Sequence, residues 1–124
     1  MRIYKNKAFS KWASKEGVTD QSLIEAVDEI ESGLVDADLG GHVFKKRVAV
    51  GGRGKRGGVR TLLAYQKNDA VFFIYGFAKN QRANVLEHEL RGLKAYAALL
   101  LSYSRKELLQ AIDAGVLVEV TQNG

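Results

Sequence analysis

Three segments rich in β-branched and aromatic residues follow one another in the middle of the chain, at residues 43–50, 59–66 and 71–77. Such segments favour strands, and short spacers between them favour hairpins of antiparallel neighbours. Asn68-Asp69 predicts a tight turn between the last two strands, whereas the glycine-rich GGRGKRGG at 51–58 predicts a longer, mobile hairpin loop. We therefore expect the rest of the chain to fold around this sheet.

Upstream of the strands, the sequence predicts two amphipathic helices. A short strand at 2–5 is followed by a helix over 8–15, which Gly17 closes. Thr19 or Asp20 caps the second helix, and Gly33 ends it. Together the two helices predict an amphipathic helical hairpin whose apolar side packs on a sheet.

Downstream, two helix starts and a last strand are expected. Asn84 with Glu87, and Ser104 with Glu107, have the spacing of capping boxes, and 116–120 is strand-like. At 124 residues the chain fits a single domain, 1–124, in the usual range of about 100–200 residues. We predict an α+β fold in which an N-terminal helical hairpin packs on a small, mainly antiparallel sheet, followed by C-terminal helices and a short terminal strand.

Composition excludes several kinds of protein. The chain has no cysteine, which excludes a disulfide framework, a cysteine-ligated zinc site and thiol catalysis. His42 and His88 have no neighbours at metal-ligand spacing, so we expect no metal and no other cofactor. The longest apolar runs, 71–75 and 95–101, are far shorter than the about 20 residues that cross a bilayer. We expect a soluble, cytoplasmic protein.

Acidic and basic residues are segregated along the chain. The net charge is +5, yet residues 16–44 contain eight acids and no Lys or Arg, and residues 45–67 contain eight bases and no acid. One negative and one positive surface are expected, and a positive surface favours a polyanion such as nucleic acid. The alternative is that the two blocks neutralise one another across the fold.

The glycine-rich segment matches the G-x-G-x-x-G-x-V pattern of kinase loops at 52–59, but the chain lacks the catalytic and metal-binding Asp segments of a kinase. A strand-like segment follows it, where a dinucleotide-binding loop requires a helix. Arg56 follows Lys55, where a Walker loop requires Ser or Thr. Arg53, Lys55 and Arg56 remain as candidates for RNA phosphate binding, and a solvated hairpin tip is the alternative.

Further cations are placed on the strands and after them. Because side chains alternate along a strand, Lys45 and Arg47 share one face. Arg60 shares its face with Leu62 and Ala64, so its charge needs either an anionic ligand or a salt bridge to the acidic helices. Lys79 and Arg82 precede the predicted long helix, whose N-terminus favours anions.

In this order the segments resemble a RelE/HigB-type toxin of bacterial toxin–antitoxin systems, in its phage- and plasmid-derived branch. The resemblance covers nearly the whole chain and rests on NKAFSKWA (6–13), GLVDADLGG (33–41), FKKRVAVGGRGKRGGVR (44–60), FFIYGFAKN (72–80) and LVEV (117–120).

The resemblance implies a metal-independent endoribonuclease that cuts mRNA, often on the ribosome, by attack of a 2′-hydroxyl on the adjacent phosphate. Lys45, Arg47, Arg60, Lys79 and Arg82 occupy the catalytic basic surface of the family. Asn80 and Leu86 stand where many members have an arginine and a catalytic tyrosine, so the resemblance assigns no general acid or base. It also implies a cognate antitoxin, expected to be of helix-turn-helix type.

Two other functions fit the same residues. The basic surface would serve a non-catalytic nucleic-acid-binding module, and the acidic helices with the aromatic strands would serve a protein that only docks a partner.

Overall fold

The computed structural model describes residues 1–51, 54–78, 82 and 84–121, with side chains at all of these except 54–57. The described residues form four helices: α1 (Lys7–Glu16), α2 (Asp20–Glu31), α3 (Glu87–Ser102) and α4 (Arg105–Asp113). They also form six strands: β1 (Arg2–Asn6), β2 (Ala37–Asp38), β3 (Val43–Val50), β4 (Gly54–Gln66), β5 (Ala70–Ala78) and β6 (Leu117–Glu119).

The strands make one mixed sheet in the order β2-β3-β4-β5-β1-β6, so the predicted small, mainly antiparallel sheet behind an N-terminal helical hairpin is wrong. β1 comes first and lies inside the sheet, parallel to β5 and antiparallel to β6. Only Ile3 and Tyr4 are apolar in this strand, which leaves no apolar run to indicate an interior position. The fold is still α+β overall.

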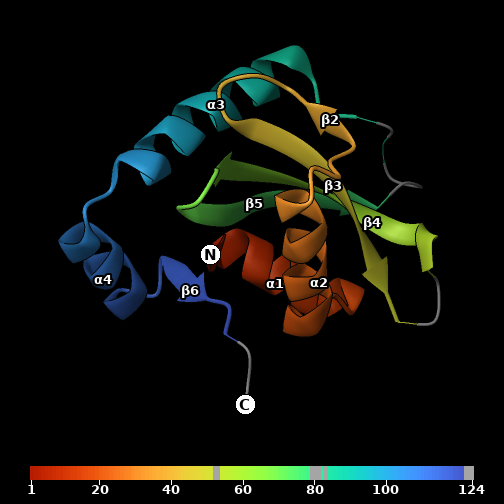
Figure 1. Cartoon of the computed structure of the whole chain (residues 1–124), viewed down its shortest axis with the longest axis horizontal. Helices are drawn as coiled ribbons and strands as arrows, with labels where there is room; N and C mark the ends of the chain where they lie inside the picture. The colour runs from red at the N-terminus through yellow and green to blue at the C-terminus, as the bar shows by residue number, and fades with distance from the viewer. Residues whose placement is uncertain (52–53, 79–81, 83, 122–124) are drawn as a thin grey trace.

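Helices cover both faces of this sheet (Figure 1). α1 and α2 pack on one face, and α3 and α4 pack on the other; we call them the α1–α2 face and the α3–α4 face. Because successive side chains of a strand point to opposite faces, the strands provide apolar side chains on both faces. For example, Phe73 is buried beneath α1 and α2, and Phe72 is buried on the opposite side. Each face therefore has its own apolar core.

Most of the predicted segments are present, some with bounds shifted by one residue, and two begin several residues from their predicted starts. β4 begins at Gly54, paired with Val50, so the connection after β3 is shorter than the predicted loop 51–58. α3 begins at Glu87 after the N-cap Leu86, where the sequence predicted a start at Asn84. The capping box of Ser104 and Glu107 at the start of α4 is confirmed.

Asn6 joins the first strand to the first helix and to the middle of the sheet. Its Oδ1 accepts a hydrogen bond from Phe9 N at 2.7 Å, and its Nδ2 donates to Ile74 O at 3.1 Å.

In the part of the chain that the structure describes, no helix is long and apolar enough to cross a membrane.

The close approach of α1 to β5 depends on a glycine. A Cβ at Gly76 would overlap the ring of Trp12, which lies directly over this strand residue. The Trp12 ring in turn packs against Phe9, with centroids 5.4 Å apart.

Gly76→Ala is therefore expected to lower the free energy of unfolding by about 1–3 kcal/mol, because the Trp12 ring must shift out of its packed position. Gly92→Ala in α3 is the matched control, since an added Cβ meets nothing within 4 Å there. It should stabilise the protein by up to about 1 kcal/mol through helix propensity. Urea denaturation of both variants measures the difference, and equal effects would contradict the close approach.

Candidate functional site

Two rows of side chains cross three strands on the α3–α4 face. One row contains Lys45, Leu62 and Tyr75, which are partners in register across β3, β4 and β5. The next row contains Arg47, Arg60 and Phe77. Residues directly opposite one another in antiparallel strands project to the same side, so the structure brings three predicted site residues, Lys45, Arg47 and Arg60, together.

Arg60 is the most unusual side chain in these rows. It is only 8% exposed, and its buried Nη1 has no hydrogen-bond partner. No ion pair of Arg60 is formed among the described residues. Its cross-strand neighbour Arg47 carries the same charge, and like charges directly opposite one another destabilise a sheet. This arrangement favours an anion as a ligand.

The acidic helix neutralises a different cation. Lys46 Nζ lies 3.0 Å from Glu29 Oε1 of α2, on the α1–α2 face, and the Lys46 side chain is 5% exposed. The predicted alternative, a salt bridge to the acidic helices, thus describes Lys46. Arg60 projects to the opposite face of the sheet, away from α2.

Arg47 is held more loosely than Lys46. Its side chain is 46% exposed, and its Nε lies 3.8 Å from Asp36 Oδ1. Its backbone N–H also donates to the Asp36 carboxylate. An exposed pair at this distance contributes little, so the Arg47 guanidinium can exchange Asp36 for another anion at low cost.

Arg82 lies in a dense network beside these rows. Its Nη1 and Nη2 donate to the two carboxylate oxygens of Glu89 at 3.1 and 2.6 Å. Nη1 also donates to the Tyr75 hydroxyl at 3.0 Å, and Nε donates to Asn84 O at 2.8 Å. The guanidinium is therefore fixed by groups of the protein itself.

Glu89 ties this network to the start of α3, since its Oε1 also accepts from Leu86 N at 2.8 Å. The hydrogen bond from Arg82, followed by that from the Leu86 backbone, lowers the pKa of Glu89 to about 2. The hydrogen bonds to Glu89 and Tyr75 raise the pKa of Arg82, so the pair stays charged.

The remaining predicted residues are placed only in part. Lys79 and Arg53 lie outside the described residues, while Lys55 and Arg56 belong to β4 with side chains outside the described part. His42 is at a turn with φ 63°, and His88 is in the first turn of α3. Among the residues that the structure describes, no cluster of His, Asp and Glu could hold a metal ion.

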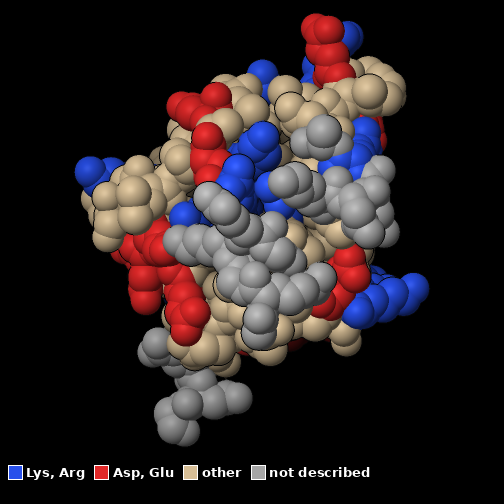
Figure 2. Space-filling view, turned by 90° about the vertical axis from the view of Figure 1, so that its right-hand side faces the viewer, with Lys and Arg blue, Asp and Glu red and all other residues tan. Residues whose placement is uncertain are grey.

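Figure 2 shows Lys and Arg side chains gathered near the centre of one face of the molecule, with Asp and Glu side chains towards its margins. This is the side towards which β3 and β4 extend in Figure 1. The expected positive surface is thus visible as a patch.

Sequence reasoning missed Tyr75 and Glu89. Tyr75 lies in the apolar run FFIYGF and was grouped with the strand, although its half-buried position distinguishes it from buried neighbours. Glu89 is seven residues from Arg82, and only the turn before α3 brings the two together. An acid in the first turn of a predicted helix was the available signal.

The two buried cations should respond in opposite ways to replacement by Met. Arg60→Met is expected to raise the free energy of unfolding by about 1–3 kcal/mol, because it removes an unpartnered buried charge. Lys46→Met should lower it by about 1.5–3 kcal/mol, because it removes a charged hydrogen bond to Glu29. Urea denaturation measures both, and a marked loss in Arg60→Met would show that Arg60 has a structural partner.

Acid should weaken the Arg82–Glu89 pair in a defined pH window. Because folding lowers the pKa of Glu89, its contribution to stability is complete above its ordinary pKa of about 4.5 and disappears as the pH falls towards about 2. Glu89→Gln should lack this pH dependence. As the pH falls from about 4.5 to about 2, the melting temperature of the wild type should therefore decrease towards that of the variant. Glu87→Gln, in the same helical turn, is the control and should follow the wild type.

We compared the sequence with models of protein families and with curated proteins. A family model described as the RelE toxin of the RelE/RelB toxin–antitoxin system matches residues 1–120. No curated protein matches the chain. The matched range contains every strand and helix described above, and with them both rows of the site.

Proposed function

Because the chain belongs to the RelE toxin family and is the toxin of a toxin–antitoxin module, we propose that it is an endoribonuclease that cleaves mRNA without a metal ion. The family implies an antitoxin as partner. We propose that this antitoxin is of helix-turn-helix type and that cleavage takes place in the cytoplasm, on mRNA bound to the ribosome.

The observation that carries the proposal is the buried Arg60, beside Arg47 and without an ion-pair partner among the residues that the structure describes. A phosphodiester supplies the anion that Arg60 lacks and that Arg47 can take in exchange for its exposed Asp36 partner, and guanidinium groups bind phosphate oxygens in a bidentate manner. Since Arg60 is already desolvated in the apolar sheet, its attraction for a phosphate is stronger than that of an exposed arginine.

In the proposed reaction, the 2′-oxygen of one nucleotide attacks the adjacent phosphorus while the bond from phosphorus to the 5′-oxygen breaks. The products carry a 2′,3′-cyclic phosphate and a 5′-hydroxyl. Arg47 and Arg60 stabilise the extra negative charge of the five-coordinate phosphorus. Lys45 adds a third positive charge beside them, and the 2′-hydroxyl proton is lost to solvent water.

We propose supporting roles for the other predicted cations. Lys79 adds positive charge where β5 ends, and Arg82 belongs to the same basic surface. Arg53, Lys55 and Arg56 contact phosphates that flank the cleaved bond, which adds affinity without sequence preference.

Expression of the wild type in bacteria is expected to stop growth and to create mRNA fragments with 5′-hydroxyl ends, which end mapping detects. Arg60→Met should remain folded, bind the antitoxin and lose toxicity, because cleavage slows by about 10²–10³-fold when one preorganised charge is removed. Arg2→Met is the matched control, since Arg2 pairs with Asp69 beside the start of β5, far along the strand from Phe77.

Unchanged growth and transcript ends at confirmed soluble expression would contradict the nuclease. Growth arrest without new ends would favour a protein that blocks RNA or a partner by binding alone. Toxicity retained in Arg60→Met would remove Arg60 from the site.

A further inference from the structure

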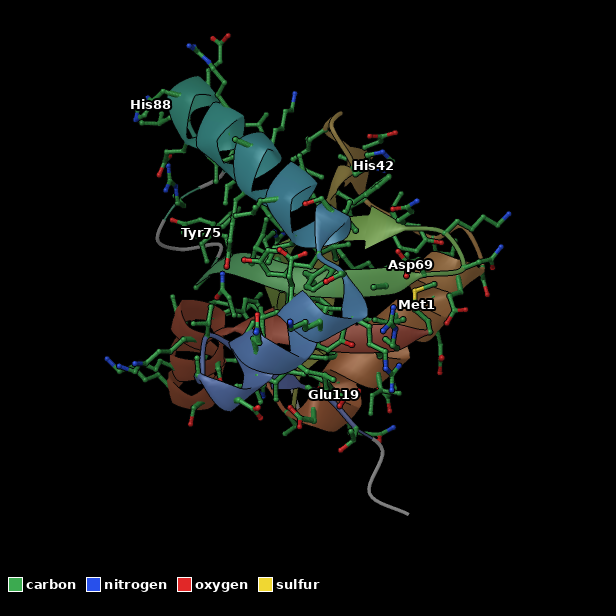
Figure 3. All side chains as sticks on the ribbon, turned by 90° about the vertical axis from the view of Figure 1, so that its left-hand side faces the viewer. Met1, His42, Asp69, Tyr75, His88 and Glu119 are labelled. Atoms are coloured by element: carbon green, nitrogen blue, oxygen red, sulfur yellow. The ribbon has the colours of Figure 1, made fainter. Side chains whose placement is uncertain are left out.

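Tyr75 is the one hydroxyl group in the two rows of the site. It is the register partner of Leu62. It also lies two residues before Phe77, which pairs with Arg60. The diagonal neighbour on an adjacent strand is within reach of a long side chain, so Tyr75 and Arg60 can contact the same small ligand. Figure 3 shows Tyr75 near the start of α3, at the end of the sheet away from Asp69.

The hydrogen bonds of Tyr75 leave its proton available. A guanidinium only donates, so in the 3.0 Å contact with Arg82 Nη1 the Tyr75 oxygen is the acceptor. The hydroxyl makes no other hydrogen bond among the described residues. The phenolic O–H is therefore free to donate to a ligand at the site.

Arg82 is poorly placed to contact a substrate itself. Glu89 binds both of its terminal nitrogens, and Asn84 O accepts from Nε. Turning the guanidinium towards RNA would break these bonds and leave the Glu89 carboxylate without its cationic partner. What this network fixes is the position of the Tyr75 hydroxyl, with a positive charge next to its oxygen.

We propose that Tyr75 is a catalytic residue, the general acid that protonates the departing 5′-oxygen, and that Arg82 and Glu89 are positioning residues that act through it. This rests on the proposed nuclease function. As the 2′-oxygen bonds to phosphorus and the bond to the 5′-oxygen breaks, the Tyr75 proton moves to the 5′-oxygen. The phenolate that remains is stabilised by the Arg82 guanidinium and regains its proton from water.

The test compares two RNAs of the same sequence, free and loaded on ribosomes, one with the natural 5′-oxygen and one with sulfur in its place at the cleaved bond. A thiolate leaves without protonation, so only the oxygen substrate needs a general acid. Tyr75→Phe should slow single-turnover cleavage of the oxygen RNA by at least about 100-fold and of the sulfur RNA by less than about tenfold. RNA affinity should change by less than about threefold.

Arg82→Gln should give the same preference for the sulfur RNA, which a purely structural defect would not produce. Tyr65→Phe removes a hydroxyl from β4 on the α1–α2 face and is the matched control, expected to cleave both RNAs like the wild type.

Each outcome decides between separate claims. If the wild type cleaves and Tyr75→Phe is slowed equally on both RNAs, or on neither, Tyr75 is not the acid and the nuclease proposal stands. If the wild type cleaves neither RNA, the nuclease function fails, and the role of Tyr75 fails with it.

Discussion

Arg60 brings a positive charge into the α3–α4 face of the sheet, which is packed mainly by apolar side chains, and no acid of the described residues pairs with it there. A fold tolerates such a charge only if other contacts outweigh its cost. Two apolar cores and the buried Lys46–Glu29 pair on the opposite face supply those contacts. The site is therefore an unsatisfied position in a well-packed sheet, and an anionic ligand can satisfy it.

Local patterns in the sequence predicted β3 and β5 and the helices near them, because alternation, caps and turn residues act over a few positions. They also predicted the strand that becomes β1, but not its position inside the sheet, because its two neighbours are set by pairing over long distances. Alternation also placed Lys45 and Arg47 on one face, which the register confirms. Alternation could not predict which buried cation forms an ion pair with the acidic helix, because that depends on which face of the sheet α2 covers. In the structure this cation is Lys46, which pairs with Glu29 of α2.

The network around Tyr75 could not be read from the chain for a related reason. Tyrosine in an apolar strand is normally part of the core, and Arg82 was grouped with the cations that bind RNA. The turn before α3 brings the Glu89 carboxylate to the Arg82 guanidinium, and only the structure shows the ion pair between them. A count of positive residues therefore overstates how many of them a ligand can reach.

The interior position of β1 also determines when this toxin can become folded during synthesis. β1 is made first, but its partners are residues 70–73 of β5 and 117–119 of β6. Folding that depends on such distant pairs is slow, since long loops must close before the contacts form. β1 therefore gains its two neighbours in the sheet only after β5 and β6 have been made, although it is the first strand of the chain.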